Sequence, residues 1–377
     1  MKPIRILVLI LCAGFMSAAW AQRPASKCSN NWSEFHRHNM QRWNPCEKVL
    51  NVHNVGSLVM KWSYDAGDYV GSSPAVANGV AYVGSGYGNV YALNAKTGQK
   101  LWNYAVGGKV NSSPAVANGV VYGGSGYGDV YALNARTGLL LWSYDTIFGV
   151  NSSPAVANGV VYVGANDGNV YALNAGTGAK LWTYATGSVV DSSPAVASGV
   201  AYVGSRDGSV YALNARTGTK LWSYNTGGGA SSPAVANGVV YVGSDPDTHV
   251  YALNARTGAK LWSYAARNLV WSSPAVANGV VYVGADDANV YALNARTGAK
   301  LWSYATGGRV DSSPAVANGV VYIGSVDDYT VYALNARTGA KLWSYATGGP
   351  VESSPAVTNG MVYFSSDDGN VYAFGLK

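Results

Sequence analysis

The stretch SSPAVANGVVYVGADDANVYALNARTGAKLWSYATGG, residues 272–308, recurs in eight variants along the chain. Its proline returns every 39 to 41 residues, at Pro74, Pro114, Pro154, Pro194, Pro233, Pro274, Pro314 and Pro355. A period near forty residues is typical of propellers and solenoids. PAVA, VVYVG, NVYALNA and KLWSY read as four short strands, joined by Asn-Gly, an Asp-rich turn and Arg-Thr-Gly. Because no stretch has helical periodicity, each period predicts a four-stranded antiparallel propeller blade.

The two ends of the repeat array predict how many blades there are and how the ring closes. LVMKWSY, residues 58–64, is a fourth strand with no first three, and the last copy ends at NVYAFGLK without a fourth. Pairing the N-terminal strand into the last blade leaves no open edge. We therefore expect an all-β, eight-bladed propeller over residues 58–377. One tryptophan per fourth strand is expected to wedge between blades: Trp62, Trp102, Trp142, Trp182, Trp222, Trp262, Trp302 and Trp343.

The first residues have the pattern of a signal peptide. Lys2 and Arg5 precede an apolar run, and AWA at 19–21 offers a cleavage site, so residues 1–21 are expected to be removed near Ala21. The mature chain is then periplasmic or secreted, and neither this run nor any later stretch is long enough to span a membrane. Residues 22–57 form an N-terminal extension. In an oxidising compartment its Cys28 and Cys46 predict a disulfide, with free thiols or bridges to another chain as alternatives.

Composition excludes several classes of site. The 377 residues are 48% hydrophobic but only 12% charged, with a net charge of +6. No Cys-x-x-Cys-His sequence for a haem and no Cys/His cluster of zinc spacing is present. An exported chain without an aromatic–basic groove does not suit nucleic acid.

The repeat is fixed in some segments and variable in others. If each first strand runs from a top face to a bottom face, the invariant Asn-Gly and Arg-Thr-Gly turns lie at the bottom. The variable links between blades and the variable second turns then lie on top. The residue before each Ser-Ser-Pro should ring the top of the central channel, which places six candidate ligand- or partner-binding residues there: Asn111, Asn151, Asp191, Trp271, Asp311 and Glu352. A face whose loops differ from copy to copy on a constant scaffold suggests a binding surface. The alternative is neutral sequence change in solvent-exposed loops.

The bottom turns carry a ring of basic residues. Lys96, Arg136, Arg216, Arg256, Arg296 and Arg337 occupy the turns, and Lys100, Lys180, Lys220, Lys260, Lys300 and Lys341 follow them. This ring suits an anionic polymer or a membrane surface, and it equally suits a solvated face that keeps the protein soluble.

ALNARTGAKLW resembles the tryptophan-docking motif of the pyrroloquinoline quinone (PQQ) repeat propellers, and the resemblance covers nearly all of residues 58–377. The usual Asp of that motif is Asn in every full copy: Asn94, Asn134, Asn174, Asn214, Asn254, Asn294 and Asn335. Asn keeps the turn-forming acceptor and removes a charge.

The resemblance implies two roles. In quinoprotein dehydrogenases PQQ and calcium sit in the top funnel. Asp311 or Glu352 would then be the catalytic base, Asn111, Asn151 and Glu352 would bind calcium, and Trp271 would stack on the quinone. This chain lacks the long insertions and the adjacent Cys pair of many such enzymes. The chain also resembles the eight-bladed scaffold of outer-membrane protein assembly, which implies a non-catalytic, monomeric envelope protein that needs no cofactor and binds a protein or glycan. We favour this second role.

Overall fold

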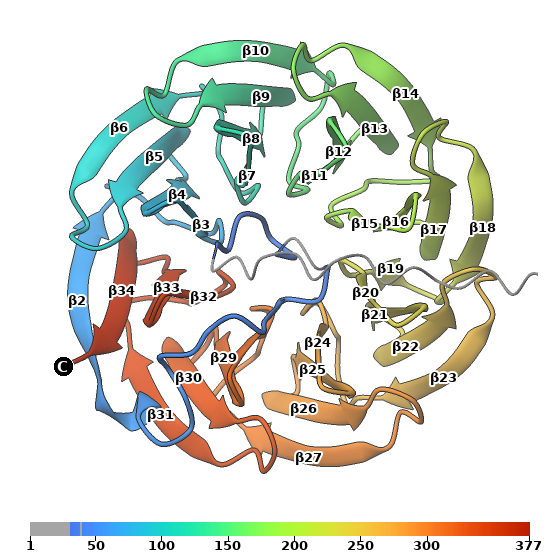
Figure 1. Ribbon diagram of the computed structural model, residues 1–377. Coiled ribbons are helices and arrows are strands. Elements are labelled where there is room, and N and C mark those ends of the chain that lie inside the picture. Colours follow the sequence, from blue (N-terminus) through green and yellow to red (C-terminus); the bar gives the residue numbers. More distant parts are fainter. Residues whose placement is uncertain (1–30, 38–39) are drawn as a thin grey trace, which may run out of the picture.

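A computed structural model describes residues 31–37 and 40–377, and it is a ring of eight blades around a central channel (Figure 1). Each blade is a four-stranded antiparallel sheet, so the predicted fold class is confirmed. The expected signal peptide and Cys28 lie outside the described residues, and the disulfide stays a prediction. Within the described part of the chain, no helix has the length and apolarity to cross a membrane.

The first two strands of each blade line the channel and the core. The first strands are β3 (Ala75–Ala77), β7 (Ala115–Ala117), β11 (Ala155–Ala157), β15 (Ala195–Ala197), β20 (Ala234–Ala236), β24 (Ala275–Ala277), β28 (Ala315–Ala317) and β32 (Ala356–Thr358). The second strands are β4 (Val80–Gly84), β8 (Val120–Gly124), β12 (Val160–Gly164), β16 (Val200–Gly204), β21 (Val239–Asp245), β25 (Val280–Ala285), β29 (Val320–Gly324) and β33 (Met361–Ser365). The Asn-Gly turns between them have positive φ at both residues, for example 50° at Asn278 and 77° at Gly279. This is the geometry that two-residue hairpins require.

The third and fourth strands form the outer half of each blade. The third strands are β5 (Asn89–Asn94), β9 (Asp129–Asn134), β13 (Asn169–Asn174), β17 (Ser209–Asn214), β22 (His249–Asn254), β26 (Asn289–Asn294), β30 (Thr330–Asn335) and β34 (Asn370–Leu376). The fourth strands are β6 (Lys100–Ala105), β10 (Leu140–Asp145), β14 (Lys180–Ala185), β18 (Lys220–Asn225), β23 (Lys260–Ala265), β27 (Lys300–Ala305), β31 (Lys341–Ala346) and β2 (Leu58–Asp65). The turn asparagine accepts two backbone bonds, as Asn254 does at 2.9 Å from Arg256 N and 3.0 Å from Thr257 N.

The ring closes through its termini, as predicted. β2 pairs antiparallel with β34, from Leu58 opposite Leu376 to Asp65 opposite Asn370, and so completes blade eight. A 3₁₀ turn, η1 (Val55–Ser57), leads into β2. Closure covers β34, which would otherwise be an additional unpaired edge in blade eight.

Each tryptophan of a fourth strand joins its blade to the next one. Trp182, for example, is buried, and its indole Nε1 donates to Ala215 O of the following blade at 3.0 Å. Its ring covers Gly218, where an added Cβ would lie only 2.8 Å from the ring and where φ is +75°. A glycine is therefore required in this turn, because any side chain would collide with the tryptophan.

The invariant Ser-Ser-Pro has a structural explanation. The second serine accepts a hydrogen bond from the matching serine one blade earlier, and Ser354 N donates to Ser73 Oγ across the closure at 2.9 Å. The first serine ties its strand to the next one, as Ser272 Oγ accepts from Gly284 N at 3.0 Å. These serines are buried. The invariant Ser-Ser-Pro thus holds the inner wall of the ring together.

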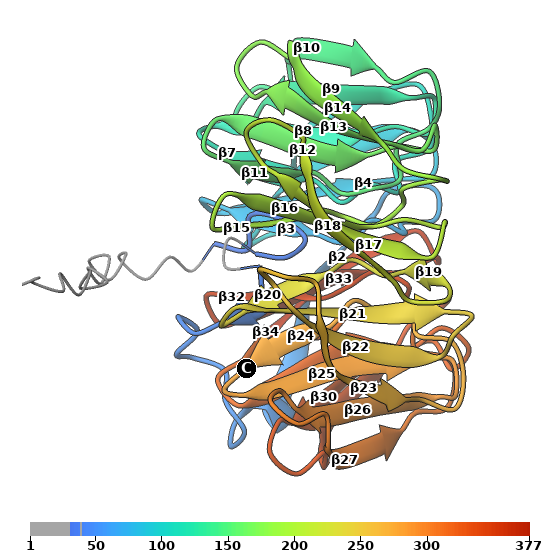
Figure 2. The same cartoon turned by 90° about the vertical axis from the view of Figure 1, so that its right-hand side faces the viewer.

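The N-terminal extension crosses the central channel (Figures 1 and 2). Residues 32–37 and 40–44, which we call the channel segment, contact the first strands of all eight blades in order. Trp32 exchanges two backbone hydrogen bonds with Val76, both at 2.7 Å. β1 (Trp43–Asn44) pairs in parallel with β28, and the Asn44 amide reaches Val357 O at 2.8 Å. Because first strands have one free edge facing the channel, the segment satisfies donors and acceptors that would otherwise be buried without partners.

The channel segment also buries charge-bearing side chains. Arg42 is fully buried and donates to Pro314 O at 2.8 Å. Burial lowers the pKa of Arg42 to about 9 and raises the pKa of Glu34 to about 7. Burial and the positive charge of Arg42 lower the pKa of His36 to about 3. The floor beneath the top face is therefore a polar layer contributed by a segment outside the repeats.

Candidate functional site

The six predicted mouth residues stand at the top ends of the first strands and are spread around the ring. They are Asn111, Asn151, Asp191, Trp271, Asp311 and Glu352, in blades two, three, four, six, seven and eight. Asn111, Trp271 and Glu352 are exposed and the others are half-buried. Five of them fall into three separate groups around the mouth, each with its own neighbours, and Asn151 belongs to none of these groups.

Arg206 connects two of the predicted residues. It opens the top hairpin between β16 and β17, and its Nη2 lies 2.6 Å from Asp191 Oδ2. Its guanidinium carbon is 6.0 Å from the centre of the Trp271 ring. When the Asn166 amide is oriented so that its oxygen and its nitrogen both have hydrogen-bond partners, the nitrogen donates to Asp191 Oδ1 at 3.0 Å. A planar guanidinium suits both an ion pair and an aromatic face, so these contacts fix its position between blades four and six.

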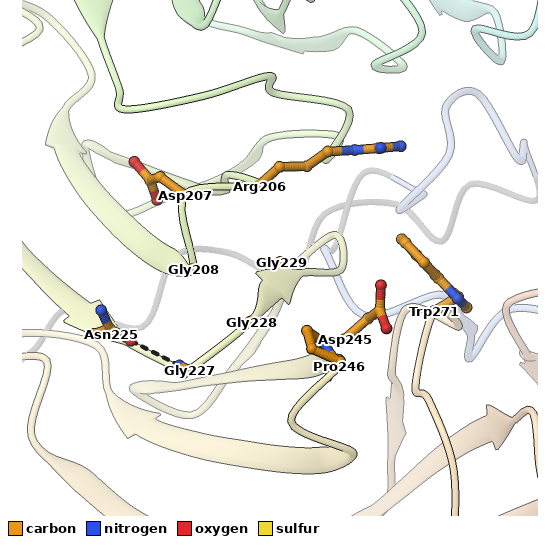
Figure 3. Close-up of a pocket in the computed structure, with 10 residues that line it drawn as sticks. All are labelled: Arg206, Asp207, Gly208, Asn225, Gly227, Gly228, Gly229, Asp245, Pro246 and Trp271. Carbon is orange, nitrogen blue, oxygen red and sulfur yellow. Dashed lines mark hydrogen bonds between the residues drawn. The ribbon is translucent and has the colours of Figure 1, made fainter.

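A pocket of about 380 Å³ opens beside this arginine. Figure 3 shows Arg206, Asp245 and Trp271 bordering the same open space, with the glycine link 227–229 along its wall. An added Cβ at Gly228 would lie 2.3 Å from Asp245 O, so no larger residue fits there. A neighbouring hollow of about 210 Å³ shares Arg206 and Trp271. The arrangement provides a cation, a carboxylate and an aromatic face around a space of ligand size.

Arg206 is absent from the sequence prediction, although the repeat contains a signal for it. It is the one basic residue that begins a top hairpin; elsewhere that position holds Gly, Asn, Asp or Val. The link TGGGA at 226–230 is also one residue shorter than the others, which accounts for the 39-residue spacing of the prolines. A shortened link beside an unusual hairpin marks the place where the regular rim is interrupted.

A second group is acidic and lies on blades six to eight. Burial, followed by the neighbouring Asp311 carboxyl, raises the pKa of Asp286 to about 7. One oxygen of each of these two carboxyls is buried without a hydrogen-bond partner among the described residues. Burial, followed by the charges of Asp367 and Asp311, raises the pKa of Glu352.

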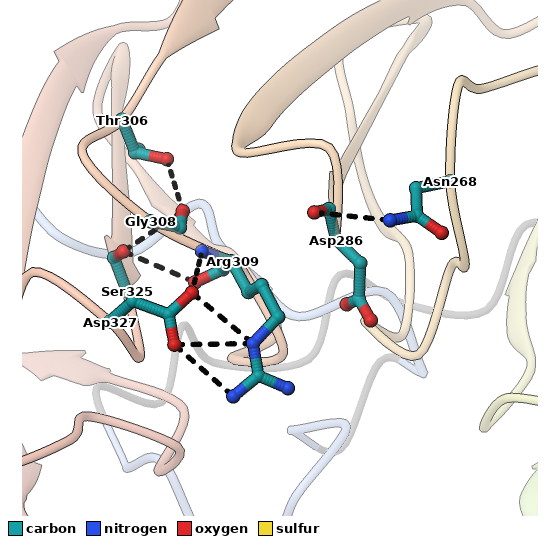
Figure 4. Close-up of polar contacts among 7 residues, drawn as sticks. All are labelled: Asn268, Asp286, Thr306, Gly308, Arg309, Ser325 and Asp327. Atoms are coloured by element: carbon teal, nitrogen blue, oxygen red, sulfur yellow. Dashed lines mark hydrogen bonds and ion pairs between the residues drawn. The ribbon is translucent and has the colours of Figure 1, made fainter.

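Arg309 borders this acidic group. Figure 4 shows Arg309 bound to Asp327, with its Nε and Nη2 atoms 3.2 Å from the carboxylate. On the neighbouring blade, Asn268 reaches the Asp286 carbonyl at 3.5 Å. Arg309 is thus already paired with Asp327, whereas Asp286, Asp311 and Glu352 have no ion pair among the described residues.

A third group is aromatic and lies on blades one to three. Tyr87, Tyr127, Ile147 and Phe148 are 69%, 74%, 77% and 58% exposed. Asn111 accepts a hydrogen bond from the Tyr69 hydroxyl at 3.1 Å. Ile147 has φ of +73°, a conformation that β-branched residues rarely adopt, in a link where Gly67 and Gly107 hold the matching positions. This apolar patch was not predicted from the sequence, because its residues do not stand next to Ser-Ser-Pro.

The residues expected to bind calcium do not fit that ion. Calcium takes six to eight oxygen ligands, usually including several carboxylates. Asn111 and Glu352 stand in blades two and eight, and the Asn111 amide oxygen is bonded to Tyr69. Over residues 31–37 and 40–377, no three or more Asp, Glu, His or Cys side chains gather as a metal site. The candidate base Asp311 lies beside the Asp286 carboxyl, and one of its own oxygens is buried without a hydrogen-bond partner among the described residues.

Known proteins resemble this chain over short stretches or over the whole fold. This chain is 36% identical over 101 residues to lupanine 17-hydroxylase [cytochrome c] of Pseudomonas sp. The matched stretch covers 26% of this chain and 14% of that protein. It is 45% identical over 67 residues to the quinoprotein alcohol dehydrogenase PedE of Pseudomonas putida, covering 17% and 10%. The matched stretches are therefore small parts of these relatives.

The solved structures and the family model extend over most of the chain. The structure of BamB from Moraxella catarrhalis superposes with a TM-score of 0.73 at 21% identity, over 85% of this chain and 100% of that chain. This likeness concerns the fold. The model of the PQQ-repeat family described as "Outer membrane protein assembly factor BamB" matches residues 54–188, 127–244, 206–324 and 286–377. The chain therefore belongs to this PQQ-repeat propeller family.

Proposed function

We propose that the protein is a non-catalytic binding module of the cell envelope, which holds a protein or glycan partner on its top face. The supporting observation is the Arg206 site: a cation held between Asp191 and Trp271 beside a pocket of about 380 Å³. The surrounding scaffold is the same in every blade, and this site departs from it.

The side chains that border the pocket indicate which chemical groups a partner would carry. Trp271 offers a flat apolar face that is 42% exposed, suited to a sugar ring or an aromatic side chain. Arg206 and Asp245 offer charge-assisted hydrogen bonds at its border. The exposed aromatic patch of blades one to three lies across the mouth from Trp271 on the same face.

Peptide and glycan arrays probed with the labelled, mature protein test this proposal. Trp271→Ala and Arg206→Ala should each remove the strongest array signals, since buried aromatic and arginine residues dominate such interfaces. Arg256→Ala, on the bottom face, is the matched control and should leave the signals intact. Array binding that is unaffected by both top-face variants would contradict the proposal.

The alternative is a PQQ- and calcium-dependent alcohol dehydrogenase. The matches to quinoprotein dehydrogenases favour it, and the scattered donors Asn111, Asn151 and Glu352 do not. Titration of the protein with PQQ and calcium, followed by the absorbance of the quinone, separates the two functions. We expect no saturable binding, and a stoichiometric complex would establish the alternative.

A further inference from the structure

The net charge of +6 conceals a separation of charge between the two faces. Seventeen of the nineteen acidic residues lie in top hairpins and links or at the strand ends beside them. The other two, Glu34 and Glu47, belong to the N-terminal extension and are buried. Only four basic residues share the top face: Lys109, Arg206, Arg267 and Arg309. One face of the disc is therefore strongly acidic.

The bottom face has the opposite character. Its twelve turn and strand-start cations are all exposed: Lys96, Lys100, Arg136, Lys180, Arg216, Lys220, Arg256, Lys260, Arg296, Lys300, Arg337 and Lys341. None of them has an ion pair within the described residues, where the three salt bridges all lie on the top face. Glu47, the described acid nearest this side, is buried and accepts from Val49 N, Leu50 N and Gly360 N. The positive field of this face is thus uncompensated.

The shape of this face indicates the kind of partner. The Asn-Gly or Ser-Gly turn has two residues in every blade, and the Asn-Ala-x-Thr-Gly turn has five in blades one to seven, so these turns reach one level. The side view shows the resulting disc, and the described part of the N-terminal extension, in blue, projects on this same side (Figure 2), where Asn318 Nδ2 donates to Leu50 O at 2.9 Å and Gly360 N donates to Glu47 Oε2 at 3.1 Å. The cations form a ring over this level and are not aligned along one groove. A ring suits a plane of negative charge better than a single polyanionic strand, which needs a track of cations.

We propose that the bottom face docks on an anionic lipid surface, with the acidic top face turned away from it. Each exposed Lys or Arg near such a surface is attracted to it, and removing one of these side chains should weaken binding by about five-fold. Many weak contacts of this kind give reversible attachment that depends on salt. This docking is independent of the top-face binding proposed above, because the two use opposite sides of the disc.

The repeats themselves show that the charges are not needed for folding. Blade three has Gly176 where other blades have Lys or Arg, and its turn keeps the same bonds, from Gly176 N and Thr177 N to Asn174 Oδ1 at 3.0 Å. Blade two has Leu140 where other blades have Lys. Neutral residues at these positions should therefore leave the fold intact, which allows the charge to be tested alone.

Flotation of the mature protein with lipid vesicles tests the inference. The protein should float with vesicles of phosphatidylcholine containing phosphatidylglycerol, should stay behind with pure phosphatidylcholine, and should be released by salt. Arg256→Gln combined with Arg296→Gln should weaken partitioning by about twenty-five-fold. Lys109→Gln combined with Arg267→Gln removes the same charge from the top face and should not weaken it. Melting temperatures of both variants should match that of the parent protein.

Four results would overturn the inference. Equal flotation with both kinds of vesicle would show that charge does not drive attachment. An equal loss in the top-face control would show that only net charge matters. If soluble polyphosphate bound more tightly than the vesicles, the ring of cations would be a binding site for an anionic polymer. If the bottom-face variants dissociated an oligomer in the absence of lipid, the ring would be a contact with a second copy of the protein.

Discussion

Replacing Glu34 by Gln should stabilise the protein at neutral and alkaline pH and have little effect at acidic pH. Glu34 is buried in the central channel, and its Oε2 atom accepts a hydrogen bond from Val156 N at 3.2 Å. A glutamine has nearly the same shape and can accept the same bond. The substitution therefore removes only the ability to become charged.

The magnitude follows from the pKa of Glu34 in the two states. Burial raises this pKa from 4.5 to about 7, so the folded protein holds a proton that the unfolded chain releases. The stability this gives is fully present below pH 4.5 and is lost as the pH rises through about 7. The difference between the two pKa values corresponds to about 3 kcal/mol. Glu34→Gln should exceed the parent protein in stability by about that amount above pH 7, relative to their difference below pH 4.5.

Urea unfolding of both proteins between about pH 4 and about pH 8 measures this difference. His36 has the opposite behaviour, because its lowered pKa gives stability that is lost as the pH falls from 6.5 toward about 3. Subtracting the two proteins at each pH cancels that contribution. Glu352→Gln, at the exposed mouth, is the matched control and should show a much smaller change with pH. A difference for Glu34→Gln that stays constant across the range would refute the burial of this carboxyl.

Three further outcomes are expected. Trp302→Ala removes an indole ring whose Nε1 donates to Ala336 O at 3.1 Å. In urea titrations this substitution should lower the free energy of unfolding by about 3–5 kcal/mol. Asp311→Ala should change the free energy of unfolding by less than about 0.5 kcal/mol. Deleting residues 22–65 removes β2, exposes β34 as an edge and should cause aggregation in sedimentation experiments; a monomer of unchanged melting temperature would contradict ring closure. Non-reducing mass spectrometry should find one bridge between Cys28 and Cys46, and two alkylatable thiols would exclude it.

The candidate site was predictable only in part. The residue before Ser-Ser-Pro was placed correctly at the mouth, since its position follows from the direction of the first strand. Arg206 was missed because its partners, Asp191 and Trp271, lie 15 and 65 residues away along the chain and meet it only around the ring. The proximity of the Asp286 and Asp311 carboxyls was missed for the same reason.

The sequence by itself determined the blade, the number of blades and the closure of the ring. Each depends on short-range signals, such as the turn that Asn278 and Gly279 form, or on a missing strand that β2 alone can supply. The tertiary structure decided the course of the channel segment and the separation of charge. That segment binds mainly through backbone atoms, which every residue carries, so its side chains give no sign of the contacts. Charge separation depends on which end of each strand faces up, and it becomes a property of whole faces only when eight blades stand in one ring.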